Sequence, residues 1–423
     1  MRTRSAVTLV ALLVGLVACT SEGGSRDDAG ATRPPTTAPT TPPGGALPFG
    51  VSAALDTQKA QAAAAGRQYR PSFVSTSNAS GGRTLTVLDV TSAGGLVAAA
   101  NPAPKTGDGE VEIGQSEVGL QREAGFAPFP RARQKCSDQP RQAVYADERD
   151  GTVTWTESAS TNLYVFDWCV FAYSPKTRTT TLLGSSATFA KGKEMPEAPG
   201  TSAPSLGNGK VYWATAYPTS GEREFGVRIV TRPLSGEGEV ATVAEGGKLP
   251  RAAGDAVYYV RSEDVAPGFP KDRYEIHRVG PDGRDTVVTS GPLAAGRQVS
   301  ALTVSGNHVS WVVAAPEQES GTLYSLDTTT KKAVTFTLGH AAPPTMFLRS
   351  TPQVLAWGNG SAAGDAGQYV YDFARGRLWR LGTEDGFSVV YAKGDVLAWS
   401  KLPEAAGSGA ATFRTAKWNA GTT

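Results

Sequence analysis

A short apolar stretch that ends in an aromatic residue recurs along the chain, and it limits the possible folds more than any other feature. One copy is Val211-Tyr212-Trp213, which follows the turn residues Asn208 and Gly209. The aromatic positions of the copies are Trp155, Trp213, Tyr259, Trp311, Trp357 and Trp399, at intervals of 58, 46, 52, 46 and 42 residues. A repeat with this period indicates an array of one supersecondary unit.

Each repeat predicts four short strands separated by turns. In residues 203–247 the strands are expected over Ala203–Leu206, Val211–Ala216, Phe225–Pro233 and Glu239–Ala244. Four antiparallel strands in about 40–60 residues are typical of a β-propeller blade. The recurrent aromatic residue then has a structural role, as a wedge between neighbouring blades. We therefore predict an all-β propeller of four-stranded blades over residues 66–420.

The two ends of the array predict a closed ring. Near the start, Ser72–Thr76, Thr84–Val90 and Gly95–Ala99 match the second, third and fourth strands of a blade. Near the end, Ser388–Ala392, Val396–Ser400 and Thr412–Trp418 match the first three. Closing the ring between these ends would protect strand edges. We predict seven blades, or six if the two partial blades merge.

The N-terminus has the pattern of an export signal. Arg2 and Arg4 precede an apolar run over Ala6–Ala18, and 13 residues of helix span about 20 Å, too short for a bilayer core of about 30 Å. The run ends in Leu16-Val17-Ala18-Cys19, which resembles the lipobox of bacterial lipoproteins. The resemblance implies a signal peptide over residues 1–18 and acylation of Cys19. An ordinary signal peptide with a chance cysteine is the alternative.

Two segments separate this signal from the propeller. Residues 19–48 are rich in Thr and Pro and nearly free of large apolar residues, so we expect a disordered tether. Residues 49–65 are alanine-rich and predict a short helix, with continued linker as the alternative. Anchor and tether together resemble those of surface lipoproteins of actinobacterial-type, high-G+C Gram-positive bacteria.

The repeats also carry a family resemblance. Thr322–Asp327 and Gln368–Asp372 are similar to the L-Y-x-x-D step of TolB-like (WD40-like) propeller repeats, and Gly254-Asp255 resembles the step that precedes it. The resemblance covers about residues 70–418 and implies architecture more than activity. Relatives in that family include periplasmic scaffold proteins and propeller domains attached to peptidases.

Charge and cysteine content limit the partners. Without Arg2 and Arg4 the chain has 39 basic and 39 acidic residues, which argues against nucleic-acid binding. Two cysteines remain after Cys19. The chain lacks the C-x-x-C spacing that is typical of zinc sites. In an exported protein we expect a Cys136–Cys169 disulfide; two buried free thiols are the alternative.

Signals for chemistry are weak. No G-x-S-x-G motif occurs, and the histidines His277, His308 and His340 lie in separate repeats. The acidic stretch Asp147–Gly151 lacks the ligand spacing of a calcium loop, so we interpret it as a solvated turn. We assign no catalytic, cofactor-binding or metal-ligating residue.

Two insertions interrupt the repeats, at Asn101–Lys135 and Asp264–Arg273. They place aromatic residues beside cations, so we predict a binding loop composed of Phe126, Phe129, Arg131, Arg133 and Phe269. The alternative is that Val111–Leu120 supplies a missing first strand and that the rest is solvated loop.

The main functional hypothesis is a monomeric, lipid-anchored propeller on the extracytoplasmic face of the cell membrane. It would bind an envelope protein, a wall polymer or a small ligand, without a cofactor. The alternatives are an extracellular propeller enzyme of lyase, glycoside hydrolase or quinoprotein type, and a scaffold of an export or envelope complex. An enzyme would gather at least two carboxylates or histidines at the ring axis, whereas a binding protein would present an apolar or aromatic face with unperturbed charges.

Overall fold

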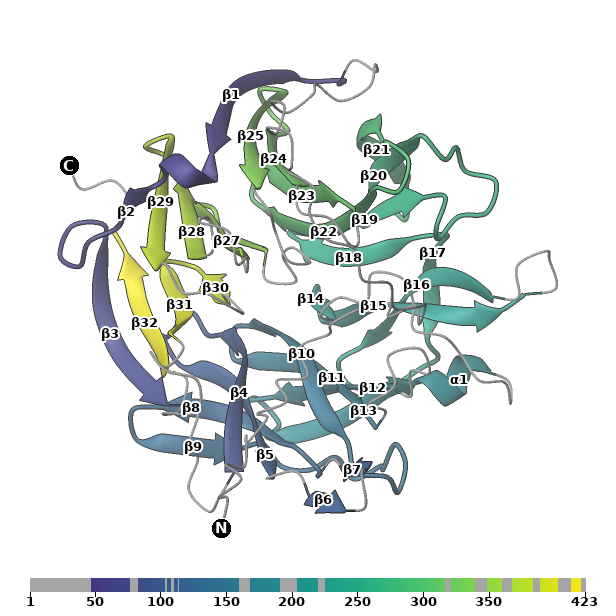
Figure 1. The fold of residues 1–423 in the computed structure, drawn as a ribbon. Coiled ribbons are helices and arrows are strands. Elements are labelled where there is room, and N and C mark those ends of the chain that lie inside the picture. The colour runs from purple at the N-terminus through teal and green to yellow at the C-terminus, as the bar shows by residue number, and fades with distance from the viewer. Residues whose placement is uncertain are drawn as a thin grey trace, which may run out of the picture.

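Seven β-sheets surround a central axis in the computed structural model (Figure 1), which confirms the seven-bladed propeller. It describes residues 47–76, 83–102, 105–107, 110–112, 114–159, 168–190, 204–219, 225–315, 321–338, 348–359, 367–382, 389–401 and 412–419. The first strand of every blade is innermost and contacts the first strands of both neighbouring blades, so the ring is closed.

The blades are numbered from the first complete one in the chain. Blade 1 is β4 (Arg83–Val90), β5 (Leu96–Pro102), β8 (Glu117–Arg122) and β9 (Gly125–Pro128). Blade 2 is β10 (Gln142–Arg149), β11 (Thr152–Ser158), β12 (Trp168–Ser174) and β13 (Thr179–Ser185). Blade 3 is β14 (Ser205–Gly207), β15 (Lys210–Pro218), β16 (Phe225–Pro233) and β17 (Ala241–Glu245). Blade 4 is β18 (Lys248–Ala253), β19 (Ala256–Ser262), β20 (Arg273–Val279) and β21 (Asp285–Pro292).

The remaining blades include strands from the start of the chain. Blade 5 is β22 (Gln298–Ser305), β23 (His308–Ala314), β24 (Gly321–Asp327) and β25 (Lys332–Leu338), with β1 (Gly50–Asp56) outside. Blade 6 is β26 (Arg349–Ser350), β27 (Val354–Asn359), β28 (Gly367–Asp372) and β29 (Arg377–Gly382), with β2 (Gln61–Ala62) outside. Blade 7 is β30 (Val390–Lys393), β31 (Val396–Lys401), β32 (Thr412–Trp418) and β3 (Tyr69–Thr76).

Strand alternation gives the ring two different ends. Hairpins between first and second strands lie at one end, which we call the hairpin face. Asn208 (φ 50°) and Gly209 (φ 68°) make such a turn, as their sequence predicts, because both tolerate positive φ. Connections between second and third strands, and between consecutive blades, lie at the other end, which we call the loop face. A hairpin of β6 (Lys105–Gly107) and β7 (Glu110–Glu112) and the short helix α1 (Ser186–Ala190) belong to this face.

The recurrent aromatic residues are buried wedges, as predicted. All six lie on second strands, and each is at most 4% exposed. Trp311 Nε1–H of blade 5 donates a 2.8 Å hydrogen bond to the Tyr274 hydroxyl of blade 4. Trp357 of blade 6 packs against Phe336 of blade 5, with ring centroids 4.9 Å apart. Blade 1 has no aromatic residue on its second strand, which is why the sequence shows six aromatic copies for seven blades.

Ring closure was predicted, but the strands near the start were assigned wrongly. Residues 72–76 lie in β3, the fourth strand of blade 7, and pair antiparallel with β32. The next two segments are β4 and β5, the first and second strands of blade 1. Blade 1 is completed by β8 and β9, which come from the stretch interpreted as an insertion. Val111–Leu120 therefore overlaps the third strand of blade 1, and supplies no first strand.

The prediction of a helix over residues 49–65 is wrong. This segment forms β1, a single 3₁₀ turn at Thr57–Lys59 and β2. β1 pairs parallel with β25, and β2 pairs parallel with β29 (Figure 1). The open edges of two blades offer backbone hydrogen bonds, and these outweigh the weak helical preference of alanine. The described residues 47 and 48, expected in the tether, precede this edge segment directly, and Leu47 packs against the core.

No helix in the described ranges is long and apolar enough to cross a membrane. Residues 1–46, which include the expected signal peptide, Cys19 and most of the expected tether, lie outside those ranges.

Phe49 should anchor the edge segment. Its ring is 8% exposed and meets the rings of Trp311 and Tyr324 edge-on, at 5.8 and 6.3 Å. Replacing Phe49 with Ala should lower the free energy of unfolding by about 2–4 kcal/mol, because it leaves a cavity against two aromatic rings. Urea unfolding measures this loss. Val51→Ala is the matched control, since Val51 is 48% exposed, and equal losses in the two variants would contradict the anchoring role.

Candidate functional site

A pocket lies on the loop face, where blade 1 passes into blade 2. The connection from β9 to β10 covers it, and its volume is about 510 Å³. Its apolar lining includes Phe129, Trp155 and Phe171, and its polar lining includes Arg131, Arg141 and Glu157. We call this cavity the junction pocket.

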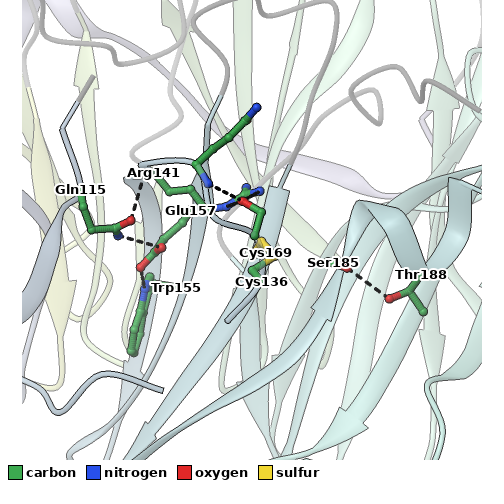
Figure 2. The surroundings of a disulfide bond; sticks show 10 residues. Gln115, Cys136, Arg141, Trp155, Glu157, Cys169, Ser185 and Thr188 are labelled. Carbon is green, nitrogen blue, oxygen red and sulfur yellow. Dashed lines mark hydrogen bonds between the residues drawn. A yellow bond between two sulfur atoms is a disulfide. The ribbon is translucent and has the colours of Figure 1, made fainter. Parts of the chain in front are cut away.

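A buried carboxylate forms one wall of the junction pocket. Glu157 is 7% exposed, on the second strand of blade 2. Trp155 Nε1–H donates to its Oε1 at 2.8 Å, and Gln115 Nε2–H donates to its Oε2 at 3.3 Å (Figure 2). Burial raises the pKa of Glu157, although these two hydrogen bonds and the nearby arginines oppose the shift.

The connection over the pocket is held at several points. A disulfide joins its Cys136 to Cys169 of β12, with the Cα atoms 6.3 Å apart, which confirms the predicted pair. Arg141 N–H donates to Gln115 Oε1 at 3.1 Å, and the Arg141 guanidinium donates to the Ser137 hydroxyl at 2.8 Å (Figure 2 shows the disulfide, Gln115 and Arg141 together). The pocket roof is thus cross-linked covalently to blade 2 and hydrogen-bonded to blade 1.

Three of the five predicted binding residues line this pocket. Phe129 stacks on Tyr173 of blade 2, with ring centroids 4.0 Å apart, so its ring is packed against that blade. The Arg131 side chain is 76% exposed and lies 3.4 Å from Glu117, while Arg133 is exposed.

The other two predicted binding residues lie elsewhere. Phe126 packs against the small apolar cluster of blade 1. Phe269 lies in the loop between β19 and β20 of blade 4, between Arg261 and Arg273, each 5.8 Å from its ring centroid. The five residues of the two insertions therefore do not lie together, because blade 4 is not adjacent to the junction of blades 1 and 2.

A second group of polar residues lies at the ring axis, near the hairpin face. Lys393 Nζ of blade 7 is 3.2 Å from Asp89 Oδ2 of blade 1 and 3.0 Å from Asp147 Oδ1 of blade 2. It also donates to the Glu148 carbonyl oxygen at 2.5 Å. Asp89 Oδ2 accepts the backbone N–H of Glu148 at 3.0 Å, and Asp147 Oδ2 accepts that of Leu206 of blade 3 at 2.8 Å. We call Lys393, Asp89, Asp147 and Glu148 the axial clamp, because they join blades 7, 1, 2 and 3.

Titration in the axial clamp follows from burial and charge. Burial raises the pKa of Asp89 and of Glu148. The positive charge of Lys393 lowers both pKa values, but by less than burial raises them. Burial alone would also raise the pKa of Asp147, but the Lys393 charge and the Leu206 N–H hold it below its usual range. Burial would lower the pKa of Lys393, but the three carboxylates raise it.

These shifts have opposite consequences for stability. Asp147 stabilises the fold above its unfolded pKa, and this contribution is lost as the pH falls through its folded pKa. Asp89 and Glu148 have the opposite effect on stability. Their raised pKa values mean that the fold binds their protons more tightly than the unfolded chain does, and the stability gained in this way is lost as the pH rises. Lys393 stabilises the fold at and below neutral pH, and its contribution is lost only at high pH.

The axial clamp corrects the interpretation of Asp147–Gly151 as a solvated turn. Asp150 and Gly151 do form an exposed hairpin turn, but Glu148 is 2% exposed and Asp147 is part of the clamp. One signal for the clamp is visible in the sequence: Asp89 interrupts the apolar run Val87–Val90, where a charge is costly unless it is paired.

The two histidines in the described ranges lie in different blades and do not converge. His277 of blade 4 lies between Glu275 and Asp285, both at 3.0 Å. His308 of blade 5 stacks on Phe373 at 3.8 Å, and His340 lies outside the described residues. Across the described ranges, no group of three or more His, Cys, Asp or Glu side chains is arranged to hold a metal ion.

No family model matches the chain, and no curated protein matches it. Several solved structures are similar to the chain at low identity. An oligogalacturonate lyase in complex with manganese has 10% identity and a TM-score of 0.47, over 85% of this chain and 98% of that one. A Mycobacterium tuberculosis puromycin-hydrolysing peptidase has 15% identity and a TM-score of 0.47, over 84% of this chain and 55% of that one.

An uncharacterised protein from Listeria monocytogenes EGD-e has 9% identity and a TM-score of 0.43, over 81% of this chain and 92% of that one. The two named activities belong to propeller-containing enzymes. Similarities this low carry no argument about the activity of this chain.

The axial clamp should depend on its cation. Lys393→Met removes the cation that pairs with buried Asp89 and with Asp147, whose side chain is 24% exposed, so the free energy of unfolding should fall by about 3–5 kcal/mol at pH 7. The loss should shrink as the pH falls towards about 4, where the carboxylates take up protons. Urea unfolding across this pH range measures both effects.

Lys417→Met is the control for this prediction. Lys417 lies in the same blade, 3.6 Å from Asp395, but its side chain is 58% exposed, so its loss should be at most about 1 kcal/mol. The double variant D89N/K393M should lose less than the sum of the two single changes. Additive losses would show that Asp89 and Lys393 do not interact.

Proposed function

We propose that this chain is a lipid-anchored, extracytoplasmic binding protein that takes its ligand in the junction pocket. The observation that carries the proposal is the pocket itself: about 510 Å³ of space, three aromatic rings, a buried glutamate and a roof cross-linked by a disulfide. Binding sites in proteins are typically concave, mostly apolar and furnished with a few placed polar groups. A fixed roof also reduces the ordering cost of binding.

The site of binding differs from the one we expected of a binding protein. In the described ranges, the exposed large apolar side chains are Val51, Val74 and Val287, on three different blades. They form no apolar face, and single exposed apolar residues carry no functional meaning. The pocket, with its buried charge, therefore replaces the apolar face in the proposal.

Catalysis at the ring axis is the second candidate function. The axial clamp meets the criterion of two or more carboxylates at the axis, and Asp89 Oδ1 and Glu148 Oε2 are buried without a hydrogen-bond partner among the described residues. However, Asp89 is 0% and Glu148 2% exposed, so a substrate has no direct access to either. We therefore place ligand binding in the pocket ahead of catalysis at the axis.

The anchor rests on the lipobox resemblance and on the tether composition. The proposed arrangement is a cleaved signal over residues 1–18, an acylated Cys19 and a flexible segment that leads to the propeller. The envelope, as the compartment, also suits a disulfide.

Replacing Cys19 with Ala should remove the lipid and release the protein into the medium. The measurement is a blot of membrane and medium fractions from cells that make either form. Thr20→Ala is the control and should stay in the membrane fraction. Retention of the Cys19→Ala protein in membranes would contradict the anchor.

Filling the pocket should abolish ligand binding without unfolding the propeller. Ala132 is half-buried in the pocket wall, and Ala132→Trp should occupy the cavity. Native mass spectrometry of the full chain, purified from the membranes of its own cells, should show a bound small molecule on the wild type and none on this variant. The control is Ala124→Trp, at an exposed hairpin outside the pocket, which should keep the molecule. The same adduct on all three proteins would place the ligand elsewhere, and no adduct on any of them would contradict the binding function.

A further inference from the structure

The charged side chains around the junction pocket differ in the partners that they contact. Four cations line it, namely Arg131, Arg133, Lys135 and Arg141, together with the carboxylates Glu117, Asp138 and Glu157. Glu117 is shared, because it contacts Arg83 of blade 1 as well as Arg131. Glu157 accepts two N–H donors from the protein, which offset part of the cost of burying its charge.

This leaves a cationic rim. Lys135 lies 3.3 Å from Asp138, but the side chains are 80% and 94% exposed, so this pair is weak in water. Arg133 is exposed and has no charged or hydrogen-bonded partner among the described residues. A guanidinium in this state presents a planar fork of donors that matches a carboxylate.

The interior of the pocket is flat and aromatic. Phe129 lies 13° from parallel with Tyr173 and 29° from parallel with Trp155. Trp155 is in turn stacked on Phe171, 5.6 Å away. Roughly parallel rings form walls that accept another flat apolar group by offset stacking.

An unpaired buried hydroxyl in the pocket favours a ligand that carries a polar group. Thr180 lines the pocket, is 8% exposed, and its Oγ1 has no hydrogen-bond partner among the described residues. Leaving such a group unsatisfied costs about 1–3 kcal/mol, which an entering ligand can recover.

From these features we infer that the junction pocket binds a small, flat, carboxylate-bearing molecule, with its ring against Phe129 and Trp155 and its carboxylate at Arg133. This inference rests on the proposed function, because it names the ligand class of the same pocket. A neutral molecule would leave Arg133 without a partner, and a cation would meet repulsion from Arg131, Arg133 and Lys135.

Isothermal titration of the full chain with three probes of one ring system tests the charge. The probes are 2-naphthoate, 2-naphthylmethanol and 2-naphthylmethylammonium. We expect 2-naphthoate to bind at least about tenfold more tightly than the alcohol, as a charge-assisted hydrogen bond implies. The ammonium should bind most weakly. Equal or tighter binding of the alcohol or the ammonium would overturn the inference.

Matched arginine variants test the contact. Arg133→Gln should weaken 2-naphthoate about tenfold and leave the alcohol unchanged. Arg284→Gln, at an exposed turn of blade 4, should change neither. An unchanged affinity of Arg133→Gln for 2-naphthoate would overturn the role of Arg133.

The Ala132→Trp variant separates the two proposals. If a neutral or cationic probe binds best and Ala132→Trp abolishes that binding, the pocket is a binding site and only the ligand class is wrong. If none of the probes binds the wild type, the inference fails together with the proposed small-ligand site.

Discussion

Ring closure is the interaction on which the rest of the structure depends. β3, from the start of the propeller, pairs along its length with β32, from its end, so one antiparallel ladder joins the two ends of the propeller. At the axis, Lys393 of the same blade contacts Asp89 of blade 1 and Asp147 of blade 2. Every wedge between blades needs two neighbours to be buried, and without closure blades 7 and 1 would each lack one.

The junction pocket depends on an irregular connection between two blades. Blade 1 is the first blade after the closing strand, and Trp155 of blade 2 is the wedge that packs against it. Its junction with blade 2 is completed by the connection over residues 129–141, which contributes Phe129 as a packed ring. Cys136 then joins the connection to blade 2. The pocket thus lies beside the wedge Trp155, under a connection that is cross-linked to blade 2.

Much of the fold could be predicted from the sequence, because periodicity is a property of the sequence itself. The strands of blades 3 to 6, the Asn208-Gly209 turn and the wedge role of the aromatics followed from local patterns. The role of β3 did not, because a strand has the same pattern whether it pairs with the next residues or with residues more than 300 positions away. The helix predicted for the edge segment that begins at Phe49 was wrong for a related reason. Alanine favours a helix only where no open strand edge competes for the backbone hydrogen bonds.

The site was predictable only in part, because sequence distance does not give spatial neighbours. Phe129, Arg131 and Arg133 were chosen as an aromatic residue beside cations, and they do line one pocket. Their most important companion, Glu157, belongs to an ordinary-looking strand, and only the hydrogen bonds from Trp155 and Gln115 distinguish it. Phe269 has the same local composition as Phe129, yet its neighbours are the arginines of its own blade.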